Sequence, residues 1–281
     1  MGLGASSCWA LANVAVARAG RDIGWFRALL WAQVAGTGMA ALASAALDQP
    51  HWALVPSLGG WIALAAVTAL LGYGCMFYAF EHGRLTIAVP IMSSWAVISA
   101  ALSIGVFGER LGGTQLAGGA AVVAGALLVS RFAHSEGPRA ADGAKPRWLL
   151  ASIGGAIGFG VLIPLMDRLV PVFGSIGAVG AVYVADLVLA LPLALAFRAG
   201  LRPPSGAAWW PVLAAGFLET AGFACITVGA RFAPVALISP FASLASAITV
   251  AYAWAVLRER PPRAILVGAA FVTAGVVVLA L

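Results

Sequence analysis

Two acidic residues lie inside segments of the chain that are otherwise apolar. Asp186 is near the centre of a predicted helix over 174–198, and Glu219 is near the middle of a predicted helix over 208–231. An ionisable group at the centre of a membrane helix costs about 2.5–3.5 kcal/mol on insertion scales, so it usually faces a cavity or a partner. We therefore expect proton coupling or contact with a cationic group on a substrate. The alternative is that each acid is protonated and joins two helices by a hydrogen bond.

Five aromatic residues also lie within predicted helices and not at helix ends: Trp9, Tyr78, Trp95, Tyr183 and Phe241. Any one of them, taken alone, would be expected to pack against lipid or another helix. As a set they could line a cavity for an organic substrate, because small-molecule sites are mostly apolar and aromatic.

Pro90 and Pro240 are each about five residues into a predicted helix, over 85–107 and 234–256 respectively. Proline removes one backbone donor and disfavours helical geometry at the preceding residue. Interrupted helices that face each other commonly build a substrate site at the membrane midplane, so we predict that both prolines are hinges. The alternative is that a proline near a helix start is simply tolerated.

The elements that position these residues must be membrane helices. Charged residues make up 9% of the chain and apolar residues 62%, whereas a soluble domain has about 25% charged residues. Runs of about twenty apolar residues match the thickness of a bilayer. We predict ten transmembrane helices: 2–17, 25–47, 58–81, 85–107, 113–132, 147–166, 174–198, 208–231, 234–256 and 262–281.

The chain repeats itself with a shift of 150 residues. This shift aligns Pro90 with Pro240 and Glu109 with Glu259 without a gap. We therefore predict two five-helix repeats, 1–132 and 147–281, joined by a linker over 133–146. Because each repeat has an odd number of helices, the second enters the membrane in the opposite sense, and the two repeats are expected to enclose a central cavity.

The basic residues predict an orientation for this bundle. Of the 16 Lys and Arg residues, 13 lie on the connections that follow the odd-numbered helices. Under the positive-inside rule those connections are cytoplasmic, and both termini face away from the cytoplasm.

The sequence G-E-R-L at 108–111 ends the fourth predicted helix, and R-E-R-P at 258–261 ends the ninth. Together with the duplicated five-helix plan, these motifs resemble the EamA-type carriers of the drug/metabolite transporter superfamily, over the whole chain. The resemblance implies an inner-membrane carrier of bacterial type that exports small metabolites, amino acids or drugs. Its YddG-type branch handles aromatic amino acids and viologen-like cations.

Two other functions are open from the residues alone, a polytopic enzyme acting on lipids and a channel. Such an enzyme needs a cluster of His, Asp or Glu at one interface, and the sequence contains no such cluster. No ring of acids or carbonyl-filter motif indicates a channel. We expect no enzyme activity, cofactor, metal or nucleic-acid partner. The expected partners are the lipid bilayer, a small-molecule substrate and protons.

Overall fold

A computed structural model describes residues 1–47, 55–107, 112–133, 147–196, 201–230, 244–259 and 262–279. All regular secondary structure in these ranges is helical. The helices are α1 (Gly2–Ile23), α2 (Trp25–Leu47), α3 (Val55–His82), α4 (Leu85–Met92), α5 (Trp95–Phe107), α6 (Gly113–Ala133), α7 (Arg147–Ala196), η3 (Gly206–Ala208), α8 (Trp209–Ala230), α10 (Ala245–Ala255) and α11 (Arg263–Leu279).

Long apolar runs form the helices of this bundle, and many of their side chains point outward. Four segments are long and apolar enough to cross a membrane: Trp25–Leu47, Ser57–His82, Arg147–Met166 and Ile176–Ala196. Leu42, Leu127 and Val188 are each more than 60% exposed, on three different helices. An apolar surface of this kind suits lipid and not water, because exposed apolar patches of soluble proteins are small.

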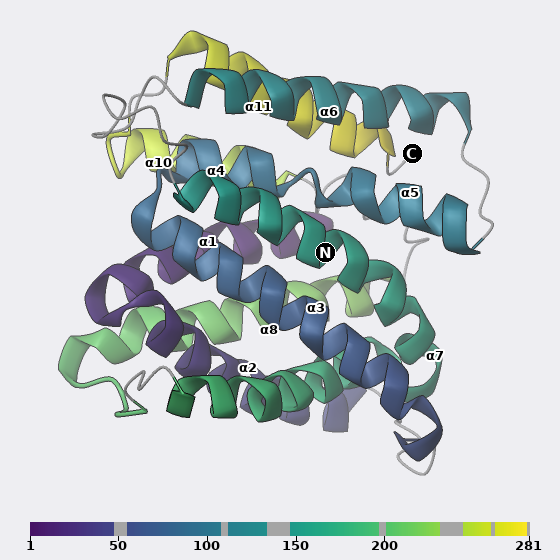
Figure 1. Cartoon of the computed structure of the whole chain (residues 1–281), viewed down its shortest axis with the longest axis vertical. Helices are drawn as coiled ribbons and strands as arrows, with labels where there is room; N and C mark the ends of the chain where they lie inside the picture. The colour runs from purple at the N-terminus through teal and green to yellow at the C-terminus, as the bar shows by residue number, and fades with distance from the viewer. Residues whose placement is uncertain are drawn as a thin grey trace.

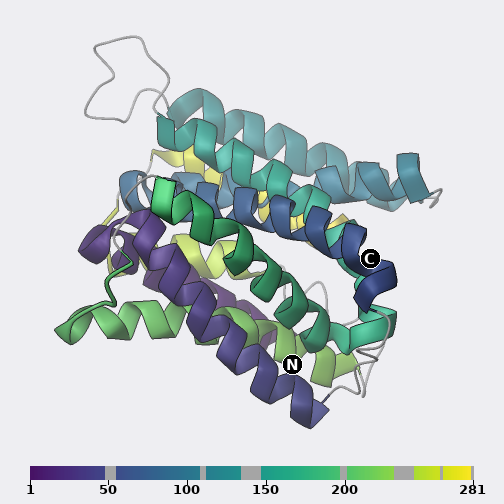
Figure 2. The ribbon, with the colours of Figure 1, turned by 60° about the horizontal axis from the view of Figure 1, so that its bottom comes forward.

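Helices from the first half of the chain pack mainly on helices from the second half. α3 packs along α7, while α1 and α2 pack on α8. The pair α6 and α11 lies along the top of the molecule in Figure 1, and α4, α5 and α10 lie between this pair and the lower bundle. The turned view in Figure 2 keeps α6 at the same outer edge.

Two glycines separate helices next to the predicted starts at residues 25 and 174, but the preceding helices continue beyond their predicted ends. α1 continues to Ile23, beyond the predicted end at residue 17, and α7 continues through 167–173, where a loop was predicted. The helical course breaks instead at Gly24, with φ of 84°, and at Gly174, with φ of 73°. Glycine adopts such angles readily because it has no Cβ. These two breaks are 150 residues apart.

The predicted helix 85–107 is interrupted, because α4 ends at Met92 and α5 begins at Trp95. Pro90 lies inside α4, where it removes one backbone donor. Three residues later, the Ser93 hydroxyl donates to the carbonyl of Val89 at 2.9 Å, a local bond that often bends helices. Both effects weaken the helical ladder at this point.

Contacts between the halves occur in matched pairs. A Cβ on Gly72 in α3 would lie 3.0 Å from the ring of Phe159 in α7, and a Cβ on Gly222 in α8 would press on the indole of Trp9 in α1. Gly72 and Gly222 are 150 residues apart, and so are Trp9 and Phe159. The same contact is therefore made twice, with the two halves exchanging roles.

The α6–α11 pair repeats this relation. A Cβ on Gly125 would lie 2.6 Å from the carbonyl oxygen of Gly268, and a Cβ on Gly275 would lie 2.6 Å from that of Gly118. Glycines at a helix crossing let the backbones approach closely, which matters where no hydrophobic effect drives association.

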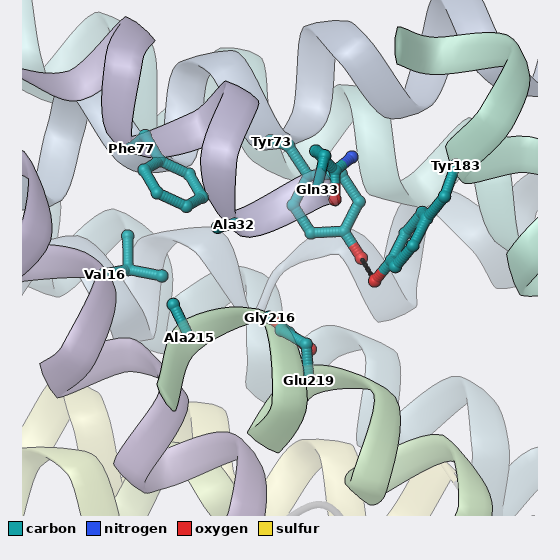
Figure 3. Close-up of a pocket in the computed structure, with 9 residues that line it drawn as sticks. All are labelled: Val16, Ala32, Gln33, Tyr73, Phe77, Tyr183, Ala215, Gly216 and Glu219. Atoms are coloured by element: carbon teal, nitrogen blue, oxygen red, sulfur yellow. Dashed lines mark hydrogen bonds between the residues drawn. The ribbon is translucent and has the colours of Figure 1, made fainter. Parts of the chain in front are cut away.

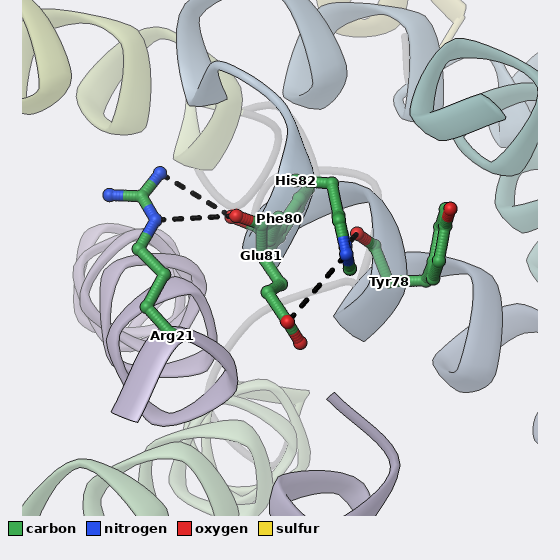
Figure 4. A network of polar contacts seen from close by, with 5 residues as sticks. All are labelled: Arg21, Tyr78, Phe80, Glu81 and His82. Atoms are coloured by element: carbon green, nitrogen blue, oxygen red, sulfur yellow. Dashed lines mark hydrogen bonds and ion pairs between the residues drawn. The ribbon is translucent and has the colours of Figure 1, made fainter. Parts of the chain in front are cut away.

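Several basic connections gather at one end of the bundle. Arg21 donates from Nη2 to the carbonyl of Gly83 at 3.3 Å, so α1 meets the end of α3 (Figure 4). Arg27 donates from Nε to the carbonyl of Arg202 at 2.6 Å. We call this region, made of residues 18–27, 83–86, 201–206 and 257–259, the arginine-rich end.

Candidate functional site

A small cavity lies where five helices meet. Its lining comes from α1, α2, α3, the second part of α7 and α8 (Figure 3), and consists of Val16, Ala32, Gln33, Tyr73, Phe77, Tyr183, Ala215, Gly216 and Glu219. Its volume of about 10 Å³ leaves room for about one water molecule. The structure therefore has its helices closed around a small polar centre.

Two tyrosine hydroxyls meet at this centre. The Oη atoms of Tyr73 and Tyr183 lie 3.0 Å apart, and either can be the donor. Their rings are edge-to-face, with centroids 5.8 Å apart. One hydroxyl proton is used within the pair, so the other remains for a different acceptor.

Glu219 is the acidic residue among the described residues that line the cavity. It extends from α8 on the side of the cavity where the Tyr183 hydroxyl also lies (Figure 3). Among the described residues that line the cavity there is no lysine, arginine or histidine. A site with this composition can hold a proton, accept hydrogen bonds from a donor group, or offer an aromatic face to an apolar or cationic group.

A second acid lies next to the cavity lining. Gln33 donates from Nε2 to Oδ2 of Asp186, and Asp186 is only 1% exposed. Within the described part of the chain, the other oxygen of Asp186, Oδ1, is buried and has no hydrogen-bond partner. A buried carboxyl oxygen without a partner is costly, so this position is suited to a proton or to a donor that arrives during function.

Close packing of α2 on α8 sets the geometry of the site. A Cβ on Gly36 would lie 2.9 Å from the ring of Tyr183, and a Cβ on Gly216 would lie 2.8 Å from the backbone nitrogen of Gly36. Thr220 adds a hydrogen bond from its hydroxyl to the carbonyl of Gly36 at 3.3 Å. Because these residues are small, Tyr183 and Glu219 can approach the same centre.

The structure brings some of the predicted site residues together and separates others. Glu219 and Tyr183 line the cavity, and Asp186 adjoins it through Gln33. Trp9 packs edge-to-face on Phe223, with centroids 5.4 Å apart.

Tyr78 and Trp95 are not among the described residues that line the cavity either. Tyr78 stacks on His82 near the arginine-rich end, and Trp95 begins α5. Pro240 and Phe241 lie outside the described residues.

Seven of the nine lining residues were not predicted from the sequence, and three of these are polar or aromatic: Gln33, Tyr73 and Phe77. A signal for one of them was present, because Gln33 is 150 residues before Tyr183 and therefore has the same position in its half. Tyr73 and Phe77 are four residues apart on α3, the spacing that puts two side chains on one helix face. In the described ranges, no cluster of three or more His, Cys, Asp or Glu residues could hold a metal ion.

Comparison with known proteins assigns the chain to a family. The model of the EamA-like transporter family matches residues 1–131 and 146–281. One solved crystal structure aligns with 99% of this chain and 94% of its own, with a TM-score of 0.64 and 19% identity, a likeness that extends to the fold alone. No curated protein matches the sequence. With both halves matched, the chain belongs to the EamA-like transporter family, whose members are membrane transporters of small solutes.

Proposed function

We propose that this protein is a secondary transporter that exports small organic solutes by alternating access. The observation that carries the proposal is the cavity in which helices of both halves place Glu219, Tyr73 and Tyr183 around one point. A site between two halves can open to either side of the membrane if the halves rock against each other. Amino acids, metabolites and drugs with a donor group and an apolar body fit such a lining.

The proposal includes a ten-helix architecture of two inverted repeats, 1–132 and 147–281, around the cavity. It is supported by contacts made twice in the register of 150 residues, such as Gly72 on Phe159 and Gly222 on Trp9. Such reciprocal contacts are expected when a pseudo-twofold axis lies in the membrane plane.

Glu219 is the proposed proton-coupling residue, and Asp186 is the second candidate. Glu219 lines the cavity, so it could exchange a proton with whichever side the cavity faces. Asp186 has a buried oxygen without a partner among the described residues. In this scheme, proton binding and solute binding alternate at one centre.

Pro90 is the proposed hinge of the first half, and Pro240 would be its counterpart. The support is the interruption of the helix between Met92 and Trp95. Pro90→Ala should slow uptake while leaving the folded protein intact, because a continuous helix bends less readily. Uptake at the wild-type rate by the folded variant would argue against a hinge.

The orientation follows from the basic connections. If the arginine-rich end is cytoplasmic, both termini face outward from the cytoplasm of a bacterial inner membrane. A reporter active only in the periplasm should then be active after Leu281, and one active only in the cytoplasm should be silent. The reverse result would invert the orientation.

Uptake into proteoliposomes tests the function directly. A screen over amino acids and organic cations, with and without a pH gradient, should find solutes whose accumulation depends on the protein and increases with the gradient. Absence of protein-dependent uptake for every solute class would contradict the proposal. Flux that follows the solute gradient at channel-like rates would favour a pore.

A further inference from the structure

At the arginine-rich end the two halves are joined by Arg27 with Arg202 and by a second polar contact, between Glu259 and the start of α4. The carboxylate of Glu259, just after α10, accepts hydrogen bonds from the start of α4. Oε1 accepts from the backbone nitrogen of Leu85 at 3.2 Å. Oε2 accepts from the backbone nitrogen of Thr86 at 3.0 Å and from its hydroxyl at 2.8 Å.

This carboxylate takes the place of a helix cap. The first backbone N–H groups of a helix have no partner within the helix, and the helix dipole favours a negative charge there. Arg84, at the N-cap position, makes no side-chain capping hydrogen bond. The N-terminus of α4 is therefore capped by the other half of the molecule, through charge-assisted bonds that are stronger than neutral ones.

The backbone before Glu259 is shaped to direct its side chain back into the molecule. Arg258 has φ of 57°, and it is the sole non-glycine residue with positive φ among those described. The backbone nitrogen of Glu259 then donates to the carbonyl of Ala253 at 3.1 Å, back within α10. Left-handed backbone is unfavourable for a residue with a Cβ, so the surrounding contacts must hold this turn in place.

The two partners belong to different halves of the chain, and under the proposed alternating access the two halves move relative to each other. All eight residues of α4 are buried, and the helix is interrupted after Met92. α10 also contacts the first half at a second point, through a hydrogen bond of 3.1 Å between Asn13 in α1 and Thr249. Apolar surfaces can slide over one another, but a set of three directed hydrogen bonds is either formed or broken, which suits a two-state element.

We propose that Glu259 is a gating residue: its carboxylate, bound to the N-terminus of α4, closes the cavity toward the arginine-rich end, and its release opens that end. This inference rests on the proposed alternating access. Glu259 does not touch the solute, and it acts through the position of α4.

Access to a cysteine in the cavity tests this inference without knowledge of the solute. The protein would carry Ala215→Cys in a background where Cys8, Cys75 and Cys225 are replaced by alanine. Reconstituted vesicles would be treated with a membrane-impermeant maleimide from one side or the other. We expect Glu259→Gln to increase the labelling rate from the arginine-rich end by about tenfold, because charge-assisted hydrogen bonds are lost, and to decrease it from the opposite end.

Arg21→Gln is the matched control. Arg21 also binds the end of a helix at the arginine-rich end, but it joins α1 to α3 within one half (Figure 4). Its loss should lower thermal stability without changing the sidedness of labelling. Thr86→Val removes only the hydroxyl donor and should change labelling in the same direction as Glu259→Gln, by a smaller factor.

Unchanged labelling in both Glu259→Gln and Thr86→Val would overturn the inference, even if their melting temperatures fell, since Glu259 would then be a static cap. If Glu259→Gln does not fold, Thr86→Val decides the question. Simultaneous labelling from both ends in the parent protein would instead contradict alternating access. That result separates a failure of the proposed function from a failure of the gate.

Discussion

The two halves of this protein can be compared residue by residue, because a shift of 150 relates them throughout. Where helices pack, the halves agree: Gly72 and Gly222 each receive an aromatic ring, from Phe159 and Trp9 respectively. The helical geometry also breaks at equivalent positions in the two halves, Gly24 and Gly174. Gly72 and Gly222 each let two helices approach closely, and both halves need this at the same position.

At the cavity the halves differ. The paired positions are Gln33 and Tyr183, Gly36 and Asp186, Ala69 and Glu219, and Tyr73 and Phe223. Both acids come from the second half, whereas the first half contributes the amide of Gln33 and the hydroxyl of Tyr73. The cavity lining is asymmetric, so equivalent positions in the two halves need not have the same chemistry. Residues shared by both halves make the repeated packing contacts, and most of the polar residues at the candidate site differ between the halves.

The largest effect should come from the divergent acid. Glu219→Gln keeps the shape of the side chain but removes its titration, so pH-gradient-driven uptake should fall by about a hundredfold, within the range of coupling energies in proteins. Melting temperature should change little. Asp22→Asn, at an exposed acid that forms an ion pair with Arg18, is the charge control. Wild-type gradient dependence in Glu219→Gln would move the proposed coupling to Asp186.

A smaller effect, a loss of stability of similar size in the two halves, should come from the glycines at the α6–α11 crossing. Gly125→Leu and Gly275→Leu each insert a side chain where a Cβ alone would approach a backbone oxygen at 2.6 Å. Overpacking of this kind costs about 1–3 kcal/mol. Thermal unfolding in detergent should show similar losses for both variants. A large loss in only one of them would break the equivalence of the halves.

The smallest effect on stability should come from the hydrogen-bonded hydroxyls of Tyr73 and Tyr183, which two different positions of the halves contribute to the cavity. Tyr73→Phe and Tyr183→Phe each remove one hydroxyl of a contact worth about 0.5–1.5 kcal/mol. Because the contact is shared, the double variant should lose less stability than the sum of the single losses. Strictly additive losses would mean that the two hydroxyls act independently.

Much of the helical plan could be predicted from the sequence because a bilayer requires long apolar helices. The α2, α6 and α8 helices begin and end within two residues of their predicted bounds. Errors fall where local chemistry overrides hydropathy. The segment 18–23 carries Arg18, Arg21 and Asp22 and was predicted as a loop, yet α1 continues through it. Hydropathy alone predicts one continuous helix over 85–107, but the structure interrupts it at Ser93 and Ser94, just after Pro90.

Within the candidate site, Glu219, Asp186 and Tyr183 could be named because a polar or charged group in an apolar helix is conspicuous. Tyr73 and Phe77 could not be distinguished from the other aromatic residues of the helices, whereas Gln33 had a signal in its equivalence to Tyr183. Whether they face the cavity depends on helix rotation and on neighbours far along the chain. Trp9 illustrates the same limit, because the ring lies against Gly222 and Phe223 and not in the cavity lining.

The sequence by itself determined that the protein is made of membrane helices and that it contains two related halves. Both properties are local or periodic, so composition and a constant shift of 150 residues reveal them. Only the tertiary structure decided which side chains meet, including the hydroxyls of Tyr73 and Tyr183 and the carboxylate of Glu259 at the start of α4. The reason is physical: these partners are more than 100 residues apart, and only the packing of distant helices, such as that of Gly36 against Tyr183, brings them within hydrogen-bonding distance.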